Sequence, residues 1–130
     1  MHQAILPEGW AQPKGYANGV LAQSGQTLYV GGQIGWNARM EFETDDFVEQ
    51  VKQALENVKA VLEAGGGGAE NMVRMTWYIT DKQVYTSQLR GIGQAYRDVM
   101  GKNFPAMSVV QVLALVEDRA KVEIEVTAVI

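Results

Sequence analysis

The chain has 130 residues, and 11 Lys and Arg against 15 Asp and Glu give it a formal net charge of −4. This acidic balance disfavours nucleic-acid binding, because proteins that grip phosphate backbones carry a basic patch. Cysteine is absent and His2 is the single histidine, which excludes disulfides, cysteine nucleophiles and zinc sites built from thiolates or several histidines.

The composition is that of one globular domain. Hydrophobic residues make up 47% and charged residues 20% of the chain, which are ordinary values for a folded protein. No apolar run reaches the roughly 18 residues of a membrane span, and no basic-then-apolar signal peptide opens the sequence. We therefore predict one domain over residues 1–130 and a cytoplasmic location without membrane contact.

The first third of the chain is rich in short β-forming runs. Residues 16–23 and 27–30 are predicted as two strands, and the Ser-Gly-Gln turn at 24–26 would join them into a hairpin. His2 is expected in a loose N-terminal segment. A glycine-rich stretch at 31–35 follows, where the backbone can bend or approach another group closely.

The clearest helix in the sequence begins after Asp46. Asp46 and Glu49 have the spacing of a capping box, and the glycine run 65–68 ends the helix. Apolar residues recur at steps of three and four, which is the spacing of one buried helical stripe. They are Phe47, Val51, Leu55, Val58 and Leu62.

The second half of the chain alternates strands with one further helix. Residues 72–80 alternate apolar and polar side chains, which is typical of a half-buried strand. A helix is predicted over 86–100, and strands over 106–116 and 121–129. The resulting order β-β-α-β-α-β-β predicts an α+β fold with two helices on one face of one sheet.

The predicted strand 106–116 is apolar on both faces, since Val109 and Leu113 would lie on one face and Val110 and Val112 on the other. Two helices cover only one side of a sheet, and a strand that is apolar on both faces is buried on both. We therefore predict an obligate oligomer in which a second copy covers the other side.

Three charged side chains on the later strands are candidates for chemistry. Glu123 and Glu125 stand two residues apart, so both project from the same face of a strand. This pair is either a solvated strand face or a general acid/base at a subunit interface. Arg74 is either an ion-pair partner of one glutamate or an outward-facing charge.

Several blocks, in this order and spacing, resemble the RidA/YjgF family, which older descriptions call endoribonuclease L-PSP. The resemblance runs from about Tyr16 to the C-terminus. It rests on GGQI at 31–34, Gln50, QALENV at 53–58, LEAG at 62–65, TWYITD at 76–81, FPA at 104–106 and VEIE at 122–125.

The resemblance implies a chorismate-mutase-like fold and a homotrimer with clefts between neighbouring subunits. The family's enzymes hydrolyse reactive enamines and imines, such as 2-aminoacrylate, to 2-oxo acids and ammonia. They need neither a metal nor a cofactor. A small-molecule ligand at the subunit interfaces is the partner expected on this basis.

Family roles are carried over position by position. Tyr16 matches a tyrosine that lines the cleft, and Gly31 stands where the family usually has serine. Gly32 matches the glycine whose backbone amide faces the ligand. Glu123 matches the glutamate that holds the attacking water.

Met107 is the main departure from the family pattern. The family has arginine there, which binds the substrate carboxylate through a bidentate charge-assisted pair, and methionine cannot donate a hydrogen bond. Val109 replaces the usual cysteine. The usual asparagine before the second helix falls near Leu89 or Arg90, so Arg90 is the candidate for a displaced carboxylate clamp.

Three functions remain open from the sequence. The first is a hydrolase of enamines or imines whose substrate differs from the usual one because Met107 replaces arginine. The second is a non-catalytic trimer that binds small metabolites in its clefts. The third is an RNA-cleaving protein, which the negative charge and the lack of a basic or aromatic stacking stripe disfavour.

Overall fold

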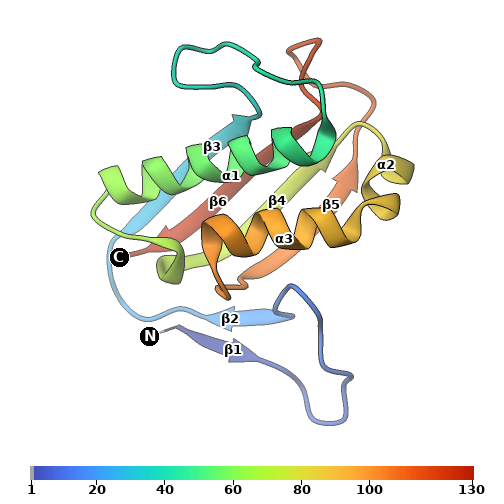
Figure 1. The fold of residues 1–130 in the computed structure, drawn as a ribbon. Coiled ribbons are helices and arrows are strands. Elements are labelled where there is room, and N and C mark those ends of the chain that lie inside the picture. Colours follow the sequence, from blue (N-terminus) through green and yellow to red (C-terminus); the bar gives the residue numbers. More distant parts are fainter. Residues whose placement is uncertain (1) are drawn as a thin grey trace.

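The computed structural model describes residues 2–130 as a twisted four-stranded sheet with helices packed on one face (Figure 1). The strand order is β3-β6-β4-β5. The strands are β3 (Thr27–Ile34), β4 (Met72–Ile79), β5 (Ala106–Gln111) and β6 (Val122–Val129). The helices are α1 (Phe47–Ala64), α2 (Lys82–Ser87) and α3 (Leu89–Met100), with a 3-10 turn at Ala69–Asn71. The α+β fold predicted from the sequence is confirmed.

Helix α1 forms where the sequence predicts it. Asp46 is the N-cap, and its side chain accepts a hydrogen bond from the Glu49 backbone N–H at 3.0 Å. The predicted apolar stripe is buried along its whole length and packs on β3 and β6. Burial of this stripe is the main source of helix stability, because helices in proteins are stabilised mostly by the packing of an amphipathic face.

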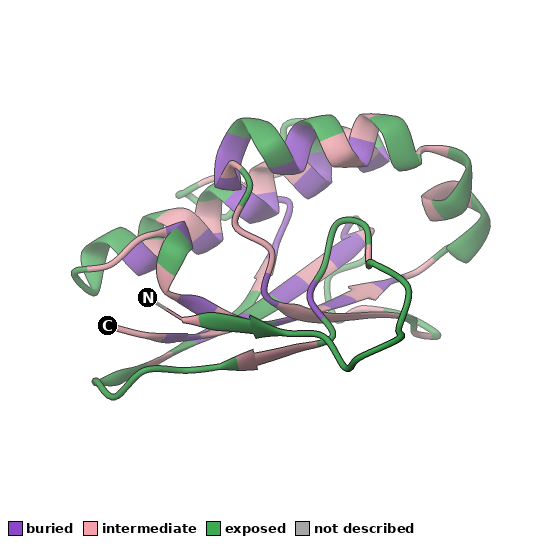
Figure 2. Cartoon of the chain, turned by 90° about the horizontal axis from the view of Figure 1, so that it is seen from below, coloured by how far each residue is buried: buried purple, intermediate pink, exposed green. Residues whose placement is uncertain are grey.

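The sheet has one covered face and one open face. On β4 the side chains of Met75, Trp77 and Ile79 are buried, and on β6 those of Val122 and Ile124 are buried. In Figure 2 the buried residues gather where the helices and the sheet meet. We call the other side the open face, and it carries the polar and charged side chains of the two central strands. They are Arg74, Thr76, Tyr78, Glu123, Glu125 and Thr127.

The hairpin predicted over residues 16–30 is wrong. β2 (Gly19–Leu21) is shorter than expected and pairs antiparallel with β1 (Gln3–Ile5), whereas β3 pairs with β6 at the other end of the chain. His2 is not loose, because its Nδ1 accepts from the Gln23 N–H at 3.1 Å and its Nε2 lies 3.1 Å from the Asn71 carbonyl oxygen. The local turn signal carried no information on these long-range partners.

The strand predicted over residues 106–116 ends five residues early, at Gln111. β5 lies at the sheet edge with β4 as its neighbour, and β4 stops where Asp81 turns the chain and caps α2. Leu113 and Val116 therefore stand in a loop and are fully exposed. This removes the strand that the oligomer prediction assumed to be buried on both faces, so the oligomer stays a prediction.

The helix predicted over residues 86–100 is divided in two. Asp81 starts helical structure earlier, at Lys82, by accepting from the backbone N–H groups of Gln83 and Val84. Gln88 then has non-helical backbone angles and separates α2 from α3. In residues 2–130, no helix combines the length and the apolar character needed to span a membrane.

Candidate functional site

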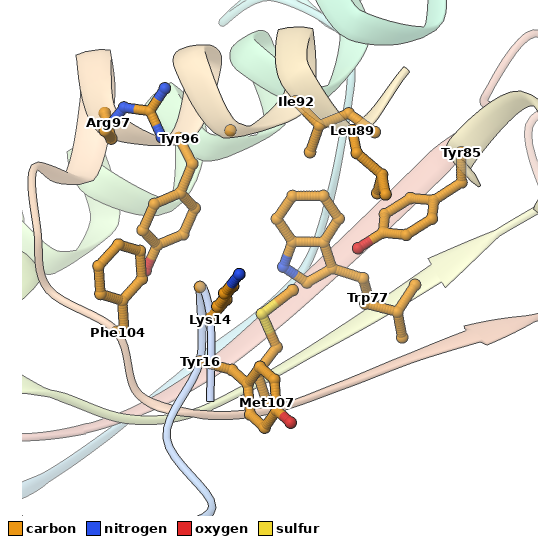
Figure 3. Close-up of a pocket in the computed structure, with 13 residues that line it drawn as sticks. Lys14, Tyr16, Trp77, Tyr85, Leu89, Ile92, Tyr96, Arg97, Phe104 and Met107 are labelled. Atoms are coloured by element: carbon orange, nitrogen blue, oxygen red, sulfur yellow. The ribbon is translucent and has the colours of Figure 1, made fainter. Parts of the chain in front are cut away.

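A cavity of about 600 Å³ lies between α3 and the strands β4 and β5 (Figure 3). The segment at residues 14–16 closes one side of it. Its lining is mostly apolar and includes five aromatic side chains. The lining residues are Lys14, Gly15, Tyr16, Trp77, Tyr85, Leu89, Ile92, Gly93, Tyr96, Arg97, Phe104, Met107 and Val109.

Backbone pairing fixes the walls of this cavity. The Ala17 N–H donates to the Pro105 carbonyl at 3.0 Å, and Ala17 forms a parallel bridge with Ala106. These contacts hold Tyr16 beside the start of β5. The parallel register of β4 and β5 sets Val109 beside Trp77, so both side chains lie on the helix side of the sheet.

The aromatic rings of the cavity are packed against one another. Trp77 meets Tyr85 edge to face at 6.3 Å between centroids, and Tyr96 stacks on Phe104 at 5.3 Å. Burial raises the pKa of both Tyr85 and Tyr96, and the Tyr96 hydroxyl donates to the Asn103 carbonyl. Both phenols therefore stay protonated at neutral pH and supply no base within the cavity.

Three cavity residues carry polar hydrogens that matter for a ligand. Trp77 is 1% exposed, and within residues 2–130 its buried Nε1–H has no hydrogen-bond partner. Lys14 and Arg97 are exposed at the rim, and no acidic side chain is among the lining residues. The cavity wall is therefore apolar and aromatic, with positive charge only at its edge.

The open face of the sheet holds the glutamates. Glu123 stands directly opposite Tyr78, and Glu125 accepts a hydrogen bond from the Tyr78 hydroxyl at 2.6 Å. This hydrogen bond is the main reason that the pKa of Tyr78 is raised, and burial and the two carboxylate charges add to it. Arg74 is exposed on the same face, in a hollow of about 360 Å³ that Glu125 also lines.

A break in strand pairing brings two glycines to Glu123. The register of β3 and β6 shifts between Val30 and Gln33, which places Gly31 and Gly32 in an irregular segment. A Cβ on Gly32 would lie 2.7 Å from Glu123 Cδ, which is closer than real contacts allow. A Cβ on Gly31 would meet nothing within 4 Å. The missing side chain of Gly32 is therefore what lets the Glu123 carboxylate lie against this backbone.

The predicted site residues fall on two sides of one sheet. Tyr16, Met107 and Val109 line the cavity beneath α3. Gly32 and Glu123 lie against each other at the break in the pairing of β3 with β6. Gly31 lines the hollow of about 360 Å³ on the open face. A single chain does not bring the two groups into one pocket.

Arg90 joins neither group. It is exposed on α3, and the preceding residue, Leu89, lines the cavity in its place. Sequence reasoning missed Trp77, Lys14 and Arg97 as cavity residues. One signal for Trp77 was available. It lies on the buried side of β4, and β4 pairs with β5, which contains Met107. Within residues 2–130, no three Asp, Glu or His side chains are grouped to hold a metal ion.

Comparison with known proteins matches residues 10–130 to the family described as Endoribonuclease L-PSP. A RutC family protein from Pyrococcus horikoshii is 31% identical over 98% of each chain. The human 2-iminobutanoate/2-iminopropanoate deaminase is 30% identical over 88% of this chain and 79% of that protein. The solved structure of YyfB from Yersinia pestis, a Rid family protein described as of unknown function, is 32% identical with a TM-score of 0.88. That similarity covers 99% of this chain and 98% of that one. The chain therefore belongs to the endoribonuclease L-PSP family, the RidA/YjgF family that its sequence blocks indicate.

Proposed function

We propose that this protein is a cofactor-free hydrolase that converts reactive enamines or imines to a carbonyl compound and ammonia in the cytoplasm. The observation that carries the proposal is the placement of Glu123 against Gly32, where a carboxylate is held beside backbone with no intervening side chain. The relatives named as 2-iminobutanoate/2-iminopropanoate deaminases support the reaction type.

The proposed active site needs two copies of the chain. Glu123 and Met107 lie on opposite sides of the same sheet, so the open face of one copy must approach the cavity of a neighbour. A homotrimer with three such clefts, as the family resemblance implies, would achieve this. The fully exposed Leu113 and Val116 are apolar surface that such an assembly would cover.

The chemistry needs one carboxylate and one water. The water oxygen would attack the C=N carbon while Glu123 accepts a proton from that water, and the imine nitrogen would gain a proton. The resulting carbinolamine would lose ammonia as its C–N bond breaks and the C=O bond forms. An enamine would first take a proton on carbon to become the imine. Every atom comes from the substrate and water, so no cofactor is required.

The substrate would differ from that of the named deaminases. Met107 lines the cavity where the family arginine would bind a carboxylate, and Val109 makes the neighbouring wall apolar. Arg90 remains the sequence's candidate for a displaced clamp, and because it does not line the cavity of its own chain, it would have to act across the subunit interface. An Arg90→Ala variant that binds ligand unchanged would exclude it.

A non-catalytic trimer that binds small metabolites is the second candidate. The apolar, aromatic cavity of about 600 Å³ favours it, since this is the size and lining of ordinary small-molecule sites. RNA cleavage, which the family description would suggest, remains disfavoured by the net charge of −4.

The test is an imine assay. An amino-acid oxidase generates imino acids with small, branched or aromatic side chains, and the release of ammonia and 2-oxo acid is followed with and without the protein. Faster release than in buffer supports the hydrolase. Release at the buffer rate, together with a ligand bound in the cavity, supports the binder. Light scattering that reports a lone 14 kDa particle at micromolar concentration would remove the shared cleft.

Restoring the family arginine gives a separate prediction. Met107→Arg is expected to raise kcat/KM for a three-carbon imino acid about tenfold, because one charge-assisted hydrogen-bond pair contributes about 1.5–3 kcal/mol. The half-buried position at the cavity edge has room for the longer side chain. The matched control is Met40→Arg, which changes an exposed methionine that is not among the cavity-lining residues. Equal gains from both variants would contradict the prediction.

A further inference from the structure

We propose that the cavity beneath α3 binds a carboxylate with a bulky aromatic side chain, and that the indole N–H of Trp77 and the ammonium group of Lys14 hold the carboxylate. This inference names the substrate class of the proposed hydrolase and rests on that function only in calling the ligand a substrate. It makes Trp77 and Lys14 specificity-determining residues.

The size and lining of the cavity point to a large apolar ligand body. In the single chain, before a neighbouring copy covers its mouth, the cavity measures about 600 Å³, which is far more than a three-carbon imino acid would fill. The rings of Tyr85, Tyr96, Phe104 and Tyr16 surround this space (Figure 3). Aromatic walls pack well against an aromatic ring in offset or edge-to-face geometry, so a phenyl-sized group suits the cavity better than a methyl group does.

The charge at the rim points to an anion. Lys14 and Arg97 are the charged residues among those that line the cavity, and both are cations. Neither takes part in the ion pairs found across residues 2–130. A positive edge on an apolar cavity raises the local concentration of an anionic ligand and favours its charged group at the mouth.

Trp77 carries a buried hydrogen-bond donor beside the cavity that nothing in the described chain satisfies. Its side chain is 1% exposed and its Nε1–H has no partner in the part of the chain that the structure describes. Buried polar groups are almost always paired, and an exception calls for a partner that the isolated chain does not contain. Figure 3 shows the Trp77 ring nitrogen and the Lys14 amine both pointing toward the middle of the cavity, near Met107. Nε1 itself is covered in this structure, so a carboxylate oxygen would reach and satisfy this orphan donor as a neighbouring side chain moves aside.

This arrangement compensates for Met107. An arginine at this position would place a third charge in the cavity, whereas methionine donates no hydrogen bond and leaves the carboxylate to other lining donors such as Lys14 and Trp77. Trp77 offers a single N–H and no charge, so it holds an anion well only beside a cation such as Lys14. The two residues therefore act as a pair, and the loss of either one should weaken the binding of carboxylates in particular.

Binding of stable 2-oxo acids tests the inference without requiring catalysis. Calorimetry on the full chain would compare phenylpyruvate, pyruvate and phenylacetone, which has the same ring and ketone but no carboxylate. We expect phenylpyruvate to bind at least tenfold more tightly than either of the others. If pyruvate binds as tightly as phenylpyruvate, the cavity does not select an aromatic side chain. If phenylacetone binds as tightly, the cavity does not recognise the carboxylate.

Substitutions identify the donors. Lys14→Met and Trp77→Phe are each expected to weaken phenylpyruvate binding about tenfold and to leave phenylacetone binding within twofold. The controls are Lys102→Met, an exposed lysine outside the cavity lining, and Trp36→Phe, a tryptophan outside it. Arg90→Met tests the rival clamp. Weakening by Arg90→Met as large as that by Lys14→Met would overturn the assignment in favour of Arg90.

Spectroscopy keeps the test independent of folding defects in the Trp77 variant. The chain has three tryptophans, so ¹⁵N-labelled protein gives three indole N–H signals, which single substitutions assign. Phenylpyruvate is expected to shift the Trp77 signal and leave the Trp36 signal in place. A Trp77 signal that stays unmoved at saturating phenylpyruvate would overturn the proposal.

The two proposals fail in different ways. Phenylpyruvate binding with the expected Trp77 shift, but no imine hydrolysis above buffer, sustains the ligand assignment and removes the proposed hydrolase. Equally fast hydrolysis of small and aromatic imines, without phenylpyruvate binding, sustains the hydrolase and removes the ligand assignment.

Discussion

Exchanging Gly32 for alanine is expected to lower kcat for imine hydrolysis about 100-fold while the protein stays folded. The added Cβ would lie 2.7 Å from Cδ and 2.9 Å from Cγ of Glu123, so that side chain must swing away. Its far end is flexible, and the move therefore costs the fold little. A displaced carboxylate no longer holds the attacking water, and positioned acid–base groups contribute roughly 10²–10⁴-fold. Steady-state kinetics and a thermal melt measure the two effects.

Two matched variants make this prediction sharp. Glu123→Gln should lose as much activity as Gly32→Ala, because the amide keeps the shape of the side chain but cannot take the proton. Gly31→Ala should keep wild-type activity, since its Cβ meets nothing within 4 Å. A fully active Gly32→Ala would remove Glu123 from the mechanism, and so would an inactive Gly31→Ala beside an active Glu123→Gln.

Replacing Gln50 with leucine is expected to destabilise the fold by about 3 kcal/mol. Its fully buried amide donates to the carbonyls of Thr44 at 3.1 Å and Arg119 at 3.0 Å, and its oxygen accepts from the Lys121 N–H at 2.9 Å. Leucine would leave these backbone groups unpaired, at about 1–3 kcal/mol for each one that water does not reach. Guanidinium denaturation at fixed protein concentration measures the loss.

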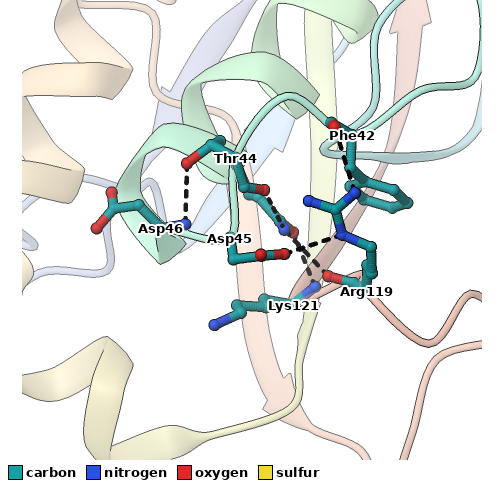
Figure 4. Close-up of polar contacts among 7 residues, drawn as sticks. Phe42, Thr44, Asp45, Asp46, Arg119 and Lys121 are labelled. Atoms are coloured by element: carbon teal, nitrogen blue, oxygen red, sulfur yellow. Dashed lines mark hydrogen bonds and ion pairs between the residues drawn. The ribbon is translucent and has the colours of Figure 1, made fainter.

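The surroundings of Gln50 join α1 to the turn before β6. Figure 4 shows Arg119 reaching across to Asp45, where its Nε donates to Oδ1 at 3.0 Å. That pair is solvent-exposed and contributes little, so the buried amide is the main link. The control is Gln94→Leu, an exposed position on α3 whose side chain bonds to its helix neighbours Arg97 and Asp98. We expect it to change the free energy of unfolding by less than 0.5 kcal/mol in either direction. A similar loss in both variants would contradict the role assigned to Gln50.

The sequence predicted those elements whose signal is local. The apolar stripe from Phe47 to Leu62 fixed α1 and its buried face, and the alternation along β4 separated Trp77 from Tyr78 correctly. Strand partners were predicted poorly, because the pairing of β3 with β6 joins residues about a hundred positions apart. The turn at residues 24–26 resembles a hairpin turn but does not join paired strands.

The candidate site was predicted residue by residue, but its spatial division was not. The alternation of side chains along a strand shows which neighbours share a face with Met107 and which share one with Glu123. Only the register of β4 with β5 and β6 shows that these two residues lie on opposite faces of the sheet. The unpaired donor of Trp77 is likewise invisible in sequence, since it depends on which neighbours fail to reach Nε1. The contact of Gly32 with Glu123 depends on a bulge that no local pattern specifies.

The position of β6 in the sheet has a consequence for synthesis on the ribosome. It lies between β3 and β4, which have no direct hydrogen bonds to each other, so the four-stranded sheet cannot close until residues 122–129 have left the exit tunnel. Until then α1 has no completed surface to cover, and a nascent chain exposes the apolar faces of both strands. We expect chaperones that hold unfolded chains to engage this protein throughout its translation.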